Sequence, residues 1–239
     1  ASPEVEAGAV VELSALLRYY RKPAETLCRQ ALVLSRAALE DEIGSDTEPL
    51  TSERERFDRS ALELVWDALR SGASELPQQA PPRLARSGQL AAGIVGARAW
   101  EELREDAHTF LDAARKLPPF ERGPARPAAV AVDLALGGQR LVGTLGEIYL
   151  AGDTLWLVAI SNASSMDFGK LLPLYAQWAA LCASHPGRLC EVALLNPKRQ
   201  DLSGFIQAPA DLQQGLHSLL AGYRDAAAQA DAYFPRSSH

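Results

Sequence analysis

The stretch VGTLGEIYLAGDTLWLVAISNA, at residues 142–163, limits the possible folds of this chain more than any other segment. It has the form of a β-hairpin, and its second strand, LWLVAI, is apolar at every position, which is typical of a strand buried on both faces. Gly152 lies in the turn between the two strands, where glycine supplies the positive φ that a short hairpin needs. These features predict a hairpin at the centre of a sheet.

Further elements surround the predicted hairpin. Residues 129–138, AVAVDLALGG, are expected to form a strand joined to the hairpin through two glycines, and residues 188–195, RLCEVALL, another apolar strand. Apolar residues recur at helical spacing in 98–116, before the strands, and in 168–183, between the hairpin and the last strand. We expect the aromatic residues of this region to fill the interface between sheet and helix: Trp156, Phe168, Tyr175 and Trp178. The order helix, three strands, helix, strand predicts an α/β fold.

That order is similar to the core of the restriction-endonuclease-like nucleases, the PD-(D/E)xK type. In that superfamily an aspartate near the end of one hairpin strand and an acidic-x-lysine triplet on the next strand hold the metal. Aligning Gly143 with the first glycine of the bacterial RecB-type motif puts Gly146 at the aspartate, and Ala159 and Ser161 at the acidic residue and the lysine. A divalent ion at a phosphodiester needs oxygen ligands, usually carboxylates, and a nearby cation assists it. The resemblance therefore implies a catalytically degenerate core, with no catalytic residue, metal or cofactor in this chain.

Three further segments carry a resemblance to one family of this shape. LSALLRYYRKPAETLCRQAL, at 13–32, contains an Arg-aromatic-aromatic-Arg-x-Pro phrase that leads into a helix, and EDEIGSDTEPL, at 40–50, is an acidic loop. LHSLLAGYRDAAAQADAYFPRSS, near the end, has the form of a closing helix with a Phe-Pro tail. Together with the degenerate core, these segments resemble the C-terminal domain of RecC, the gamma chain of exodeoxyribonuclease V.

The resemblance implies a non-catalytic domain of the RecBCD helicase-nuclease, which processes double-strand breaks for homologous recombination. RecB and RecD would be its protein partners, and forked or end-containing double-stranded DNA its nucleic-acid partner. The ATP-driven motors and the nuclease centre would lie on other subunits. Such a domain is expected at the duplex entrance, where it helps to separate the strands and provides a seat for RecD.

Composition agrees with a soluble domain of a cytoplasmic bacterial protein. A chain of 239 residues with 47% hydrophobic residues can bury one substantial core, so we expect a helical segment with acidic and Pro-rich loops at 1–88 and the α/β core with its C-terminal helix at 89–239, within one domain. No signal peptide or membrane-spanning run is recognisable, and three cysteines form an odd set without framework spacing. The formal charge of −6 means that DNA contact must come from a local patch.

A basic patch is predicted where an amphipathic helix at 10–21 is interrupted by Lys22-Pro23. Its members are candidates for DNA binding: Arg18, Tyr19, Tyr20, Arg21, Lys22 and Arg29. Cations interleaved with aromatic rings can hold phosphates and stack on bases. In the alternative interpretation, which we favour, the tyrosines pack inward while the arginines face solvent or pair with the acidic run at 40–42.

The remaining segments contain other candidates. A linker at 117–127 contains Arg122 and Arg126, which could meet a phosphate or a neighbouring subunit, and a polar loop at 196–208 offers partner contacts through Lys198, Arg199, Phe205 and Ile206. Helices are expected at 57–70, at 89–97 leading into the 98–116 helix, and from 212 onward, with an exposed connection at 76–88. Cys182, His185 and Cys190 lack a fourth zinc ligand with suitable spacing, and Gly169-Lys170 lacks the rest of a phosphate loop.

Two other functions remain open. The first is an active nuclease whose ligands have migrated to Asp133, Glu147 and Glu191, although strand alternation can point these side chains to different faces. The second is a protein-interaction scaffold that never touches DNA, which the acidic net charge would suit.

Overall fold

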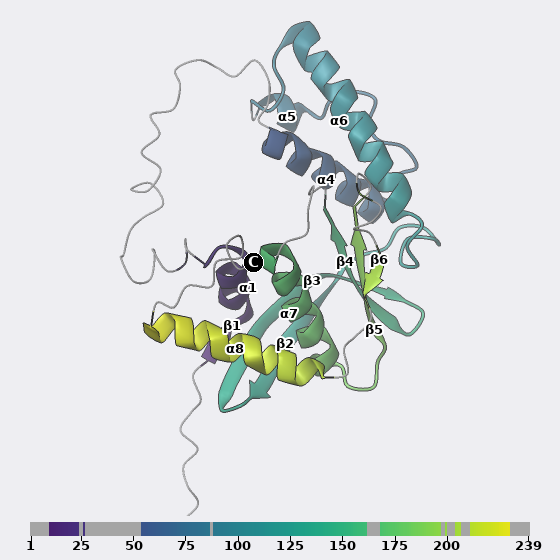
Figure 1. The fold of residues 1–239 in the computed structure, drawn as a ribbon. Helices are drawn as coiled ribbons and strands as arrows, with labels where there is room; N and C mark the ends of the chain where they lie inside the picture. The colour runs from purple at the N-terminus through teal and green to yellow at the C-terminus, as the bar shows by residue number, and fades with distance from the viewer. Residues whose placement is uncertain are drawn as a thin grey trace, which may run out of the picture.

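The computed structural model describes residues 10–23, 26, 54–86, 88–161, 168–196, 199, 204–206 and 211–229, and in this part of the chain it shows one open, mixed sheet with helices on both faces (Figure 1). The strands are β1 (Val10–Glu12), β2 (Ala128–Leu136), β3 (Gln139–Ala151), β4 (Thr154–Ile160), β5 (Cys190–Leu195) and β6 (Gly204–Ile206). Their order is β1-β3-β4-β5-β6, and β2 pairs with β3 outside this path. The pairs β1–β3 and β4–β5 are parallel, whereas β2–β3, β3–β4 and β5–β6 are antiparallel.

The predicted central hairpin is confirmed. β3 and β4 pair from Ile148 opposite Leu157 to Ala151 opposite Thr154, and Gly152 has a φ of 59° in the turn. The strand before it is also confirmed, because β2 joins β3 through two glycines, at φ of 55° and 80°, as a tight hairpin of right-handed twist requires. In β4, Leu155, Trp156, Leu157 and Val158 are all buried.

Six helices are described, and they form two groups. The first consists of α1 (Leu13–Arg21), α7 (Phe168–Ser184) and α8 (Leu212–Gln229), and the second of α4 (Arg54–Ser71), α5 (Pro82–Arg86) and α6 (Gly93–Ala114). Figure 1 shows α1, α7 and α8 gathered together, away from α4, α5 and α6. The predicted order of helix, three strands, helix and strand is present as α6-β2-β3-β4-α7-β5.

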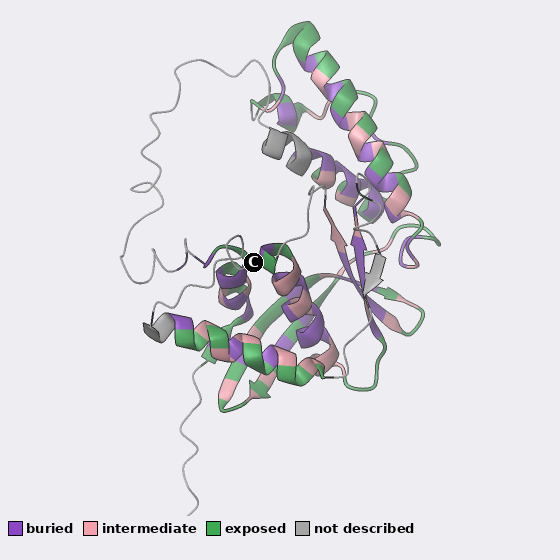
Figure 2. Ribbon diagram, in the orientation of Figure 1, coloured by how far each residue is buried: buried purple, intermediate pink, exposed green. Residues whose placement is uncertain are grey.

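Each helical group encloses a core against one face of the sheet. Trp178 of α7 and Leu216 of α8 pack with Leu155 and Leu157 of β4. On the other face, the apolar stripes of α4 and α6 pack with Tyr149 of β3 and with Trp156 and Val158 of β4. Side chains alternate between faces along a strand, so β3 and β4 contribute to both cores. Figure 2 shows buried residues, in purple, along β4 and β5.

Several expected boundaries are wrong. Val10–Glu12 is a short parallel strand on β3 rather than the start of a helix, which agrees with the preference of its two valines for strands. The segments expected at 89–97 and 98–116 form one helix, α6, and the connection at 76–88 contains α5, whose Leu84 is buried. Phe168 is 51% exposed and does not fill the interface between sheet and helix, whereas Trp178 does.

The polar loop expected at 196–208 contains β6, which pairs with β5 through Phe205 opposite Ala193 and Ile206 opposite Val192. Residues 205 and 206 are therefore part of the sheet edge. The reason is that an apolar dipeptide beside an open strand gains backbone hydrogen bonds by pairing, which local polarity does not reveal.

Candidate functional site

The three positions aligned with nuclease ligands lie where β3 and β4 separate. Gly146 stands two residues before Ile148, and Ala159 two residues after Leu157, the last pair that the two strands share. Ser161 follows β4, and its backbone N–H donates to the Leu195 carbonyl at 2.8 Å. A Cβ at Gly146 would meet nothing within 4 Å, so the space beside this residue is open. None of these positions supplies a carboxylate.

A β-bulge marks the same part of β3. Ala128 of β2 pairs with Ile148 of β3, and Val130 pairs with Leu145. Two residues along β2 thus correspond to three along β3, so β3 contains one extra residue. Glu147 lies in this bulge with a φ of 54°, a left-handed conformation that is unfavourable for a residue with a Cβ. Because of the extra residue, Glu147 meets Tyr149, although Leu145, two residues before Glu147, belongs to the core on the other face.

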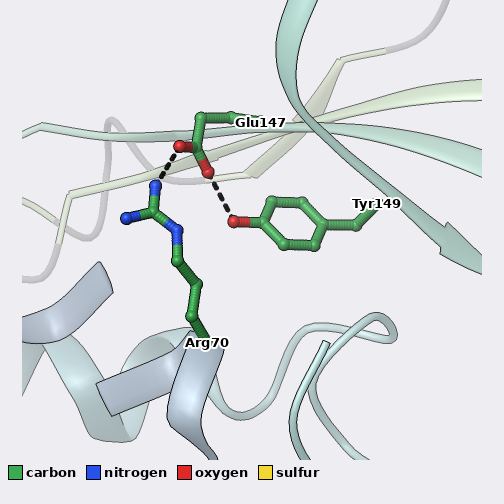
Figure 3. A network of polar contacts seen from close by, with 3 residues as sticks. All are labelled: Arg70, Glu147 and Tyr149. Atoms are coloured by element: carbon green, nitrogen blue, oxygen red, sulfur yellow. Dashed lines mark hydrogen bonds and ion pairs between the residues drawn. The ribbon is translucent and has the colours of Figure 1, made fainter. Parts of the chain in front are cut away.

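Glu147 is held by two partners from different elements (Figure 3). Arg70, near the end of α4, forms an ion pair with one carboxylate oxygen, and the Tyr149 hydroxyl donates to the other at 2.5 Å. Arg70 and Glu147 keep 40% and 36% of their side chains exposed, whereas Tyr149 is fully buried. We call these three residues the Arg70 network.

Aromatic rings surround the Arg70 network. The Trp66 ring is stacked 6.1 Å from the Tyr149 ring, Phe120 meets Tyr149 edge-on at 4.8 Å, and the Arg70 guanidinium lies 5.8 Å from the Trp66 ring centre. Burial, together with the Glu147 carboxylate, raises the pKa of Tyr149, so its hydroxyl remains a donor. Burial by itself lowers the pKa of Arg70, but Glu147 outweighs this effect and raises it. The site thus contains a fixed cation supplied by the chain itself.

The carboxylates of the migrated-ligand hypothesis do not converge. Asp133 pairs with Val142, about 16 Å along β3 from Glu147. Its oxygens accept two bonds from Arg140, at 2.7 and 2.6 Å, and these bonds lower the pKa of Asp133. Glu191 is half-buried on β5, opposite Trp156. Within the described residues, no three His, Cys, Asp or Glu side chains lie close enough together to hold a metal ion.

With this geometry in view, the chain was compared with known families. The sequence model of the RecC C-terminal domain matches residues 8–239, which is nearly the whole chain. The chain belongs to the RecC C-terminal domain family. Membership implies a role in the RecBCD complex, exodeoxyribonuclease V. A comparison with curated protein sequences finds no match.

The basic patch of this RecC C-terminal domain contains two buried tyrosines. Tyr19 and Tyr20 are 3% and 6% exposed, they meet edge-on at 4.9 Å, and the Tyr20 hydroxyl donates to the Leu219 carbonyl at 2.8 Å. Inward packing of the tyrosines is confirmed, and neither ring faces solvent for stacking on a base. Arg18, Arg21 and Lys22 are exposed, which leaves them as the DNA-binding candidates of the patch.

The structure describes only some of the other predicted contact residues. Arg122 and Arg126 are exposed in the linker between α6 and β2, and Arg199 is exposed after β5. Arg29 and Lys198, like the acidic run at 40–42, lie outside the described residues. The main chain of Phe205 and Ile206 lies in β6. No described helix of the domain is long and apolar enough to cross a membrane.

The Arg70 network was not predicted from the sequence. A weak signal existed in Glu147-Ile148-Tyr149, because residues two apart on a strand share a face. Arg70 is separated from Glu147 by 77 residues, and no local pattern connects an arginine at a helix end with that strand.

Proposed function

We propose that this domain is a catalytically degenerate, nuclease-like part of RecC that contacts the DNA duplex at the fork, assists strand separation and docks RecD. The match to the RecC C-terminal domain family carries the proposal, and the Arg70 network supports the part of it that concerns catalysis. Glu147, which follows Gly146 directly on β3, already has a guanidinium and a tyrosine hydroxyl as partners. A metal ion bound to a carboxylate can activate a water molecule for attack on a phosphodiester, whereas a guanidinium paired with Glu147 cannot. The arrangement therefore favours a structural role over hydrolysis.

Electrostatics favour a limited contact with DNA. A formal charge of −6 disfavours wrapping of a polyanion around the domain. Arg18, Arg21 and Lys22 are exposed around one end of α1, where they can hold backbone phosphates. Strand separation itself would depend on the motors of the complex, which drive the duplex onto the domain.

A retention and cleavage assay tests the proposal. The purified chain is incubated with labelled forked DNA and Mg²⁺ across a salt series, and retained and cleaved DNA are measured together. We expect retention that weakens steeply with salt, without cleavage. Arg18→Gln and Arg21→Gln, each made singly, should reduce retention, whereas Arg188→Gln, which removes one charge at an exposed arginine just before β5, serves as the matched control.

Two outcomes would contradict the proposal. Metal-dependent cleavage that is lost in Glu147→Gln or Asp133→Asn would show an active nuclease. Absence of retention even at low salt, together with firm association with purified RecD, would show a protein scaffold that does not contact DNA.

A further inference from the structure

Two cysteines of the domain, Cys182 and Cys190, lie in contact between α7 and β5. A hydrogen bond joins their side chains, and the Cys190 thiol also donates to the Arg188 carbonyl at 3.7 Å. Trp178, one helical turn before Cys182, donates its indole N–H to the Cys190 carbonyl at 3.1 Å. This face of α7 is therefore held against the start of β5, and it carries one sulfur to the other.

The connection between the two cysteines is short and lies at the surface. The backbone N–H of His185 donates to the Cys182 carbonyl at 3.2 Å, and that of Arg188 donates to the His185 carbonyl at 3.1 Å. Residues 186–189 are exposed, and Gly187 among them has a φ of 97°. A disulfide needs its sulfurs about 2.05 Å apart. Because an exposed turn joins α7 to β5, it can absorb the small movement that brings the sulfurs to this distance.

A small molecule can reach one of the two sulfurs. Cys182 is half-buried, whereas Cys190 is 6% exposed. A hollow of about 320 Å³ lies beside Cys182 and is also lined by Ala183, Asp211, Leu212 and Gln213. A water molecule needs about 10–15 Å³ of free volume, so hydrogen peroxide has room to approach. An oxidant therefore meets the Cys182 sulfur first, and Cys190 is the second sulfur behind it.

We propose that Cys182 and Cys190 form a modification site, at which a peroxide converts the two thiols to a disulfide that ties α7 to β5. Hydrogen peroxide first transfers one oxygen to the Cys182 sulfur, so an S–O bond forms, the O–O bond breaks and one water leaves. The Cys190 sulfur then attacks the Cys182 sulfur, the S–S bond forms and the S–O bond breaks. The departing hydroxide takes the Cys190 proton as a second water. Two thiols are oxidised and one peroxide is reduced.

Contact between the sulfurs decides the product more than the rate. Burial raises the pKa of both thiols, so little thiolate is present near neutral pH and the first step is slow. After that step the Cys190 sulfur is already in place, and ring closure precedes a second oxidation of Cys182 to sulfinic acid. The product is one that a thiol reductant can reverse. The modification does not depend on whether the domain binds DNA.

Mass spectrometry of the full chain in a Cys28→Ser background tests the site. The folded chain is incubated with hydrogen peroxide at pH 8, and the products are mapped after proteolysis. We expect loss of two hydrogen atoms and a cross-linked Cys182–Cys190 peptide, in about tenfold excess over sulfinic acid, with return to the dithiol after addition of dithiothreitol. The oxidised chain should unfold at a higher urea concentration than the reduced chain, because the cross-link restricts the unfolded state.

A control variant moves one thiol without removing it. Cys182→Ala combined with Ala183→Cys keeps two thiols but turns one of them by about 100° around α7, away from Cys190. This variant should accumulate sulfinic acid and little disulfide. Sulfinic acid as the main product of the Cys28→Ser chain, or an equal yield of disulfide from the control, would overturn the proposal. It would also be overturned if the folded chain stayed unmodified under prolonged exposure to peroxide that oxidises the chain in urea.

Discussion

At the scale of single residues, the environment of Glu147 shows how an unfavourable backbone conformation is maintained. A left-handed φ costs a residue with a Cβ about 1–2 kcal/mol, and two side chains from separate elements offset this cost. The Tyr149 hydroxyl has no exposure to water, so it depends on Glu147 for its hydrogen bond. Arg70 is half-exposed, and its ion pair contributes less than the same geometry would in a buried site.

We expect the free energy of unfolding to fall by different amounts when the donor and the acceptor of the Tyr149–Glu147 hydrogen bond are replaced. Tyr149→Phe removes the donor and leaves Glu147 with Arg70 and solvent, which should cost about 0.5–1.5 kcal/mol in the free energy of unfolding. Glu147→Leu leaves a buried hydroxyl without an acceptor and should cost about 2–3 kcal/mol. Urea unfolding of both variants, with Glu147→Gln as the control that keeps an acceptor, measures the difference. Equal losses for Tyr149→Phe and Glu147→Leu would show that the hydroxyl finds another acceptor when Glu147 is replaced.

The two described cysteines should react slowly in the folded protein. Burial raises the pKa of Cys182 to about 12, and burial also raises the pKa of Cys190. A pKa of about 12 in place of the usual 9.0 lowers the thiolate fraction at pH 8 on the order of a thousandfold. In a Cys28→Ser background, alkylation by iodoacetamide at pH 8 should be at least a hundredfold slower in the native state than in urea.

The raised pKa of Cys182 also makes the free energy of unfolding depend on pH. Because the pKa of Cys182 is higher in the folded than in the unfolded state, this thiol makes a contribution to the free energy of unfolding. The contribution is fully present below about pH 9 and is lost as the pH rises toward 12. Cys182→Ala should therefore show a smaller loss of stability than the unmodified chain over this range. Rapid alkylation of the native protein at pH 8 would show that the half-buried Cys182 thiol or the buried Cys190 thiol is accessible.

At the scale of elements, the contact between α1 and β3 explains why residue 143 is a glycine. A Cβ at Gly143 would lie 2.8 Å from the Leu13 Cβ at the buried start of α1, whereas a Cβ at Gly146 meets nothing within 4 Å. Gly143 thus allows a helix to pack closely against the strand. At Gly146, by contrast, nothing in the packing requires glycine.

A matched pair of substitutions on β3 tests this difference. Gly143→Ala should destabilise the protein by about 1–3 kcal/mol, because α1 must move away from the strand. Gly146→Ala should be neutral or slightly stabilising, since glycine weakens a strand interior. Thermal unfolding of the two variants gives the comparison, and a loss at Gly146 as large as that at Gly143 would show that the space beside Gly146 is not open.

At the scale of the whole molecule, the two cores share the central strands. Leu155 and Leu157 face the core of α1, α7 and α8, while Trp156 and Val158 between and after them face the core of α4 and α6. Neither helical group can leave the sheet without exposing the alternate residues of β4. The two layers are therefore expected to unfold as one unit.

Hydrogen exchange in increasing urea can measure this cooperativity. Peptides from α6 and from α7 should lose protection at the same urea concentration, because both helices depend on β4. A lower midpoint for α6 would show that the α4–α6 layer opens separately. In that case the α4–α6 layer would be an independent unit of the fold.

The types and order of the core elements could be predicted from the sequence, because each depends on local patterns. A continuous apolar strand, glycines at two turns and helical spacing on either side are sufficient for β2, β3, β4, α7 and β5. The short strands were missed, since β1 and β6 have three residues each and gain stability by pairing with distant strands. The sequence left both inward packing and base stacking open for Tyr19 and Tyr20, because neighbouring arginines say little about where an aromatic ring points.

The site was decided by tertiary structure. The sequence alone shows that carboxylates are missing at Gly146, Ala159 and Ser161, because residue identity determines which ligands exist. Only the packed structure brings Arg70 to Glu147, since their contact requires α4 to lie on the sheet and a bulge to turn the carboxylate toward it. Local periodicity determines the elements through short-range sterics and burial, whereas a contact between residues far apart in sequence depends on how the whole chain packs.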